Sequence, residues 1–89
     1  MEILIKYFEE LTLQELYEIL QLRSEVFVVE QKCIYQDIDG KDHKALHCIG
    51  KVDGKIIAYT RCFAPGIYFD EAAIGRVVVS AEQRKFKLG

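Results

Sequence analysis

The sequence predicts an α/β fold of the α+β type, with the element order β-α-β-β-β and a mainly antiparallel sheet. Three observations lead to this prediction. Thr12 and Glu15 have the spacing of a capping box and precede apolar residues at helical spacing. Asp53-Gly54 joins two strand-like runs, and a further apolar run ends near residue 80. Because 89 residues are too few for two hydrophobic cores, we expect a single domain over residues 1–89.

The first two elements are a strand and a long helix. Residues 3–8 form a short apolar run, which predicts the strand. Helical periodicity then extends over residues 13–29, where two neighbouring apolar stripes predict one wide face packed on the sheet. The stripes consist of Leu13, Leu16, Tyr17 and Leu20, and of Ile19, Leu22, Val26 and Val29.

Three strands complete the fold. Residues 45–52 and 55–63 are strand-like, and the Asp53-Gly54 pair between them favours a tight hairpin because both positions tolerate a positive φ. Pro65-Gly66 ends this hairpin, and the last strand covers about residues 72–80. Its segment 76–79 is β-branched and apolar without alternation, which predicts a strand covered on both faces.

Composition argues against several classes of partner. The net charge is −2 and the basic residues cluster at the end of the chain, so we expect no nucleic-acid partner. The first five residues have neither a basic region nor a long apolar run, so we expect no signal peptide, no membrane span and a cytoplasmic protein. Three widely spaced cysteines, Cys33, Cys48 and Cys62, are typical of reduced thiols rather than a disulfide framework.

Two arrangements of possible metal ligands do not lead to a predicted metal site. The segment Asp37-x-Asp39-Gly40-x-Asp42 resembles the start of a calcium loop, but its twelfth position is Cys48, where a bidentate glutamate is needed. His43 and His47 are one helical turn apart, but this region reads as a strand, which would separate the two rings. We therefore expect no metal.

The end of the chain has the composition of an anion site. After the last strand, Ser80 and Glu82 are suited to the start of a helix, and Arg84, Lys85 and Lys87 bring three positive charges to the same place. Backbone N–H groups converge at a helix N-terminus, and the anion most often bound at such a junction is a phosphate.

Three blocks of the sequence carry a resemblance to a known family: LRSEVFVVEQ at 22–31, CIYQDIDG at 33–40, and GRVVVS at 75–80 followed by Arg84-x-x-Lys87-x-Gly89. The third block resembles the acetyl-CoA loop of the GNAT N-acetyltransferase superfamily, whose usual form is Arg/Gln-x-x-Gly-x-Gly/Ala. Together the blocks are similar to the ElaA-like subgroup. Lys85 and Lys87 stand where the superfamily usually has glycine.

The resemblance implies transfer of an acetyl group from acetyl-CoA to an amine. It also implies roles for particular residues, on the cofactor side and on the acceptor side. Backbone groups of Val77, Val78 and Val79 would bind the pantetheine, and Arg84, Lys85, Lys87 and Gly89 would hold the pyrophosphate. Glu30 would act as the base, with Arg23 and Gln31 contacting the acceptor.

Length adds one further expectation. Domains of this subgroup are roughly one and a half times as long as this chain, so we expect a partial domain without the segment that usually supplies a general-acid tyrosine. We therefore expect weak or no turnover from residues 1–89. The alternative is a non-catalytic binding or dimerisation module. The exposed edge of the strand at 72–80 favours a homodimer in either case.

Overall fold

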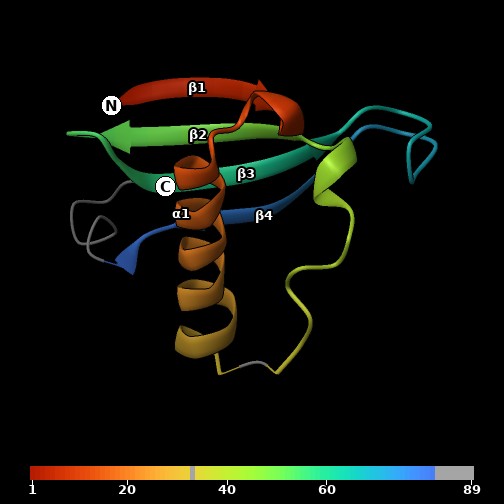
Figure 1. The fold of residues 1–89 in the computed structure, drawn as a ribbon. Helices are drawn as coiled ribbons and strands as arrows, with labels where there is room; N and C mark the ends of the chain where they lie inside the picture. Colours follow the sequence, from red (N-terminus) through yellow and green to blue (C-terminus); the bar gives the residue numbers. More distant parts are fainter. Residues whose placement is uncertain (33, 82–89) are drawn as a thin grey trace.

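A computed structural model describes residues 1–32 and 34–81, which form a four-stranded antiparallel sheet with one helix across it (Figure 1). The strands lie in chain order: β1 (Glu2–Tyr7), β2 (Leu46–Val52), β3 (Lys55–Phe63) and β4 (Ala73–Val79). Helix α1 (Leu13–Arg23) crosses one face of the sheet. Short 3₁₀ turns at Phe8–Glu10 and Asp42–Lys44 connect these elements. The predicted fold class is confirmed.

The predicted capping box starts α1. Thr12 Oγ1 accepts a hydrogen bond from the Glu15 amide at 3.0 Å, and Glu15 Oε1 accepts one from the Thr12 amide at 2.9 Å. The helix was expected to run to residue 29 without interruption. Instead α1 ends at Arg23, and a π-helix over Ser24–Glu30 continues in the same direction.

The prediction of one wide buried face on this helix is wrong. Ile19, Leu22 and Val26 are buried against the sheet, whereas Leu13 and Tyr17 are 87% and 71% exposed. A straight helix resting on a sheet buries a stripe of limited width, which Ile19, Leu22 and Val26 of the second predicted stripe occupy, whereas Val29 of that stripe is 68% exposed. The core on this side is completed by Leu4, Ile49, Ile56, Tyr59 and Val78.

The hairpin between β2 and β3 forms as predicted. Asp53 and Gly54 have φ values of +52° and +79°, and the strand ends Val52 and Lys55 face each other. Two consecutive positive φ values are those of a type I′ turn, whose twist matches that of the flanking strands.

Strand β4 departs from its prediction. It was expected to be covered on both faces, but Val78 is buried under α1 while Val77 and Ile74 are 65% and 72% exposed. Helix α1 covers one face of the sheet, and none of the described elements lies over the other (Figure 1). The pairing of β3 with β4 also shifts register between Tyr59 and Arg61, so β4 contains a bulge at Arg76, whose φ is +54°.

The face of the sheet away from α1 is apolar. We call it the open face; the register places side chains of all four strands on it, namely Ile3, Ile5 and Tyr7, Cys48, Thr60 and Cys62, and Val77 and Val79. Cys48 and Cys62 are half-buried free thiols whose Sγ atoms lie 4.0 Å apart. No helix in the described part of the chain combines the length and the apolar character that a bilayer crossing requires.

Candidate functional site

The outer edge of β4 is unpaired among the described residues, which leaves backbone groups available to a ligand. The Ser80 amide donates to the Ile57 carbonyl at 2.8 Å, and Val78 lies opposite Tyr59. In an antiparallel pair the inward and outward backbone groups alternate, so Val78 turns its groups toward β3. By the same alternation Val79 and Val77 turn theirs toward the open edge.

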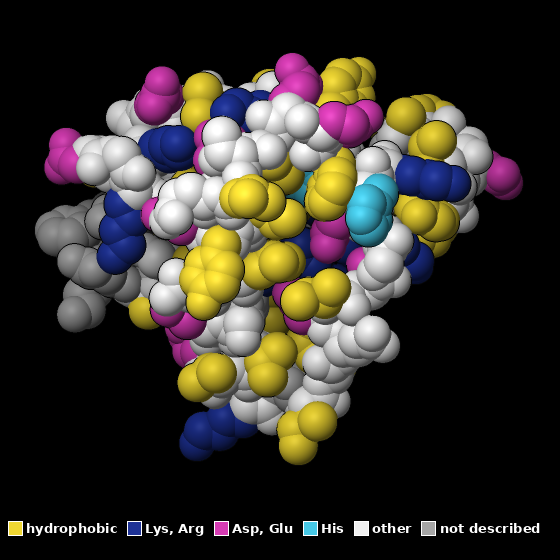
Figure 2. Space-filling model, in the orientation of Figure 1, with side chains coloured by type: hydrophobic (Ala, Val, Ile, Leu, Met, Phe, Trp, Pro, Cys, Tyr) yellow, Lys and Arg dark blue, Asp and Glu magenta, His cyan; other side chains and the backbone are white. Residues whose placement is uncertain are grey.

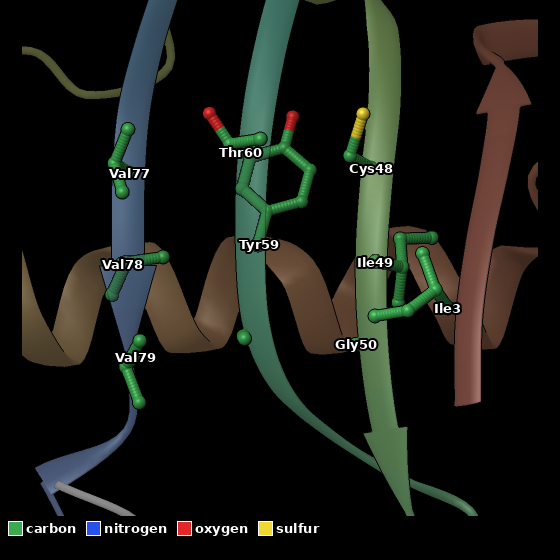
Figure 3. Close-up of a pocket in the computed structure, with 10 residues that line it drawn as sticks. Ile3, Cys48, Ile49, Gly50, Tyr59, Thr60, Val77, Val78 and Val79 are labelled. Carbon is green, nitrogen blue, oxygen red and sulfur yellow. The ribbon is translucent and has the colours of Figure 1, made fainter. Parts of the chain in front are cut away.

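The structure therefore separates the three valines that the sequence grouped together. Val77 and Val79 present backbone donors and acceptors at the edge, whereas the side chain of Val78 is 3% exposed and belongs to the core. Beside the edge, a depression of about 230 Å³ opens on the open face between β1 and β4 (Figure 3). Its lining is almost entirely apolar and includes Ile3, Cys48, Thr60, Val77 and Val79.

On the α1 side, the bulge in β4 is anchored by its own arginine. Arg76 Nε donates to Asp37 Oδ1 at 2.8 Å, and Nη2 donates to Asp39 Oδ2 at 3.2 Å. The guanidinium also lies over the Tyr35 ring, 5.5 Å from its centroid. These contacts offset the cost of a positive φ at a non-glycine residue. The segment 34–44 thus fixes the shape of β4.

Arg23, predicted to contact the acceptor, is fully buried in the same network. Its Nε donates to Asp37 Oδ2 at 3.0 Å, its Nη1 to Asp42 Oδ1 at 2.8 Å and its Nη2 to the Asp37 carbonyl at 2.8 Å. Burial alone would lower the pKa of Arg23, but the carboxylates of Asp42 and Asp37 raise it. The side chain has no exposed surface to offer a substrate and instead ties the loop to α1.

Asp39 accepts several hydrogen bonds at the mouth of this network. Arg61 donates to both of its carboxylate oxygens at 2.9 Å, and the Lys41 amide donates to Oδ1 at 3.1 Å. Burial would raise the pKa of Asp39, but these hydrogen bonds and the nearby arginines lower it to about 2. Asp39 is therefore ionised, and its oxygens are already engaged, so it is a poor candidate for a general base.

The two histidines have different partners. His47 is fully buried, with Nδ1 2.6 Å from the Tyr59 hydroxyl and Nε2 2.9 Å from the Asp42 carbonyl. Burial lowers its pKa, which favours the neutral ring. The His43 ring packs against Phe8 with the centroids 4.3 Å apart. Residues 1–32 and 34–81 contain no group of three or more possible metal ligands.

The remaining predicted site residues are Glu30, Gln31 and those assigned to the pyrophosphate. Glu30 and Gln31 are exposed where the π-helix ends. The pyrophosphate-binding residues predicted from the sequence, Arg84, Lys85, Lys87 and Gly89, lie outside the described residues.

The arginine–aspartate network is the feature that the sequence analysis missed. It joins Arg23, Arg61 and Arg76 to Asp37, Asp39 and Asp42. A signal for it was present, because each arginine interrupts an apolar helix or strand and therefore needs a buried partner. The acidic segment weighed as a calcium loop supplies the three partners.

Comparison with known proteins gives several similar chains, although no family model matches the sequence. The chain is 43% identical over 86 residues to a UPF0039 protein of Schizosaccharomyces pombe, and 42% identical over 85 residues to the protein ElaA of Escherichia coli. These matches cover 96% and 93% of this chain but 56% of each relative, so the chain spans little more than half the length of these relatives.

Solved structures agree with the sequence matches. An acyl-CoA N-acyltransferase from Pseudomonas aeruginosa superposes with a TM-score of 0.90 at 44% identity, covering 97% of this chain and 60% of that one. Escherichia coli ElaA superposes with a TM-score of 0.87 at 41% identity, covering 93% and 57%. The resemblance stated from the sequence is confirmed: this chain belongs to the ElaA-like proteins of the GNAT acyl-CoA N-acyltransferase superfamily and corresponds to part of their fold.

Proposed function

We propose that this chain binds acetyl-CoA along the open edge of β4, as part of an enzyme that transfers the acetyl group to an amine. The observation that carries the proposal is the unpaired edge at Val77 and Val79, next to an apolar depression. Pantetheine is an extended chain with two amides, so it can add to a sheet edge as a further strand would. The Pseudomonas relative's description as an acyl-CoA N-acyltransferase supports acyl-CoA as the donor.

The reaction needs positioning more than covalent chemistry. The amine nitrogen attacks the thioester carbonyl, the carbon–sulfur bond breaks, and the products are an amide and the CoA thiol. Before attack, the acceptor ammonium loses a proton to a base, for which Glu30 is our candidate, with Gln31 as an acceptor contact. Arg23 acts through Asp37 and Asp42 as a positioning residue. We assign the pyrophosphate to Arg84, Lys85, Lys87 and Gly89.

Titration of the 89-residue chain with acetyl-CoA tests this assignment. We expect weak binding, since Lys87 stands where glycine usually lets the backbone approach the pyrophosphate. The amide NMR signals of Val77 and Val79 should shift, because their N–H groups face the edge. Replacing both Arg84 and Lys87 by alanine should weaken binding about tenfold, since ion pairs in contact with solvent contribute up to about 1 kcal/mol each in general.

The matched control for this titration is Lys44→Ala, which removes a positive charge from an exposed site near the other end of the sheet. It should leave the affinity unchanged. If acetyl-CoA shifts no signal of β4, or if the double variant binds as well as the wild type, the assignment is wrong.

We also propose that residues 1–89 act as a single unit in the cytoplasm, in line with the sequence.

The runner-up function is a non-catalytic module that uses the same sheet for association. The edge of β4 and the open face favour association in both cases, because they expose Ile74, Val77 and several residues of β1 to water.

In the absence of acetyl-CoA we propose a homodimer in which two β4 strands pair about a two-fold axis, so that dimerisation and acetyl-CoA compete for the same edge. Val78 was expected to contribute to this contact, but it lies in the core, so substituting it would disrupt folding rather than association. Val77 is the better site. Val77→Lys should give a folded monomer by analytical sedimentation at micromolar concentration, whereas the wild type should sediment as a dimer. Leu13→Lys, on the exposed side of α1, should not change the mass. A monomeric wild type would contradict the proposal.

A further inference from the structure

A second pocket lies beside the amino-terminal half of β4 and is not used by the predicted site residues. It has a volume of about 430 Å³ and is lined by Ala73 to Arg76 together with Asp39, Lys41, Arg61, Phe63 and Phe69. We call it the charged pocket. Figure 2 shows Lys or Arg side chains next to hydrophobic side chains in the region of the loop between β3 and β4, where Lys41 lies over Tyr68.

Its position suits the second substrate of an acyl transfer. If pantetheine lies along Val77 and Val79, its thioester end reaches the bulge at Arg76, since the residues that we assign to the pyrophosphate follow the other end of β4 in the sequence. The charged pocket begins at this bulge. A group bound there would be adjacent to the thioester carbonyl, as attack requires.

The charge of the pocket selects the kind of group it can hold. The carboxylates of Asp37, Asp39 and Asp42 are balanced by the guanidinium groups of Arg23, Arg61 and Arg76. Lys41 adds a positive charge to this balanced network. Its Nζ lies over the Tyr68 ring, 5.2 Å from the centroid, and it forms no ion pair within the described residues. The pocket therefore favours an anion over a second ammonium.

Asp39 does not reverse this preference. Both of its oxygens accept hydrogen bonds from Arg61, Oδ2 also accepts one from Arg76, and Oδ1 one from the Lys41 amide. An incoming ammonium would have to compete with these donors. The carboxylate of a ligand, in contrast, meets Lys41 and the 22% exposed side chain of Arg76.

The rest of the wall is aromatic. Phe69 is 56% exposed at the rim, and the ring of Phe63 lies inside, edge-on to Tyr68 with the centroids 5.0 Å apart. An exposed ring in a nine-residue connection between two strands has free surface to bury against an apolar ligand group.

We infer that the charged pocket binds the amine acceptor, and that the acceptor carries a carboxylate and an apolar or aromatic group in addition to its amine. This inference extends the proposed function, and it depends on that function for identifying the bound ligand as the acceptor. The carboxylate binds Lys41 and Arg76, the apolar group packs on Phe63 and Phe69, and the amine is left to face the thioester at the bulge.

Three ligands with the same phenyl ring distinguish the contributions of the amine and the carboxylate to binding. Phenylalanine has the ring, the amine and the carboxylate; 3-phenylpropionate lacks the amine; phenethylamine lacks the carboxylate. Each is titrated into the 89-residue chain and followed through the amide NMR signals of Lys41, Phe69 and Gly75. We expect phenylalanine and 3-phenylpropionate to shift these signals, and phenethylamine to bind at least about fivefold more weakly, as for the loss of one favourable exposed ion pair.

Two variants and a control variant test whether the ligands bind in the charged pocket. Lys41→Gln should weaken the two carboxylate ligands about fivefold and leave phenethylamine unchanged. Gly75 lines the charged pocket, and a Cβ at this position meets no atom within 4 Å, so a side chain is accommodated without a clash. Gly75→Val should therefore fill part of the pocket and weaken the binding of all three ligands. Lys55→Gln removes a positive charge at the other end of β3 and should change nothing. The spectrum of each variant shows directly whether it is folded.

The outcomes separate the two hypotheses. If phenethylamine binds as well as phenylalanine, if no ligand shifts the pocket signals, or if Lys41→Gln has no effect, the ligand class is wrong even where acetyl-CoA binds β4. If acetyl-CoA fails to shift Val77 and Val79 while the carboxylate ligands still bind, the proposed function is wrong and the preference of the pocket for carboxylates stands.

Discussion

Replacing Arg23 by alanine should destabilise the chain by about 3–5 kcal/mol, the cost of leaving buried charges without their partner. Asp37 and Asp42 are 7% and 5% exposed, and each would lose a charge-assisted hydrogen bond. For a domain of this size such a loss is most of the expected stability. Urea unfolding followed by circular dichroism measures it, and the variant should be largely unfolded before urea is added.

Two further variants test whether the loss of stability comes from the buried ion pairs of Arg23. Arg23→Lys keeps the charge but not the planar fork that reaches both aspartates, so its loss should be intermediate. Lys44→Ala removes an exposed charge near the same loop and should cost less than about 0.5 kcal/mol. If Arg23→Ala lost no more free energy of unfolding than Lys44→Ala, the network would not stabilise the fold.

Acid should unfold the chain through two carboxylates. Burial would raise the pKa of Glu15, but hydrogen bonds from Lys6, the Thr12 amide and Lys51 outweigh it and lower the pKa from 4.5 to about 2. The pKa of Asp39 is likewise lowered from 3.8 to about 2. Since both groups bind protons more weakly in the folded state, their stabilisation is fully present at neutral pH. It is lost as the pH falls from the unfolded values toward 2.

At about 1.4 kcal/mol per unit of pKa, Glu15 should contribute about 3–4 kcal/mol and Asp39 about 2–3 kcal/mol at neutral pH. Chemical unfolding at a series of pH values between neutrality and pH 2 gives the slope of the unfolding free energy against pH. Glu15→Gln and Asp39→Asn should each lower the stability at neutral pH and flatten the slope below pH 5, while Glu9→Gln, in the exposed turn before α1, should do neither. A slope unchanged in both variants would assign the acid sensitivity to other groups.

Features encoded by neighbouring residues were predictable from the sequence. The Asp53-Gly54 hairpin and the Thr12–Glu15 capping box depend on contacts within four residues, and both form as expected. Features that depend on distant partners were not. Three consecutive valines indicate burial, but whether Val77 is covered depends on which elements lie over the sheet.

The candidate site likewise has parts that were predictable from the sequence and parts that were not. A strand followed by basic residues pointed to β4, but the alternation that turns Val77 and Val79 outward depends on the register with β3, which a bulge shifts. Arg23 was assigned to the acceptor because a charge among apolar residues has two explanations, a site or a buried partner. Its partners lie 14 and 19 residues away, and only the fold shows that they are in reach.

Asp37 has a consequence for communication across the molecule. Arg23 at the end of α1 donates to its Oδ2, and Arg76 at the bulge of β4 donates to its Oδ1, so two elements that are far apart in the chain share one carboxylate. A ligand that draws Arg76 away from Asp37 changes the charge balance felt by Arg23. By reciprocity, any event that displaces the end of α1 changes the affinity at β4 by the same factor. We therefore expect helix α1 and strand β4 to be thermodynamically linked through the Asp37 carboxylate, in addition to the packing of Val78 in the core beneath α1.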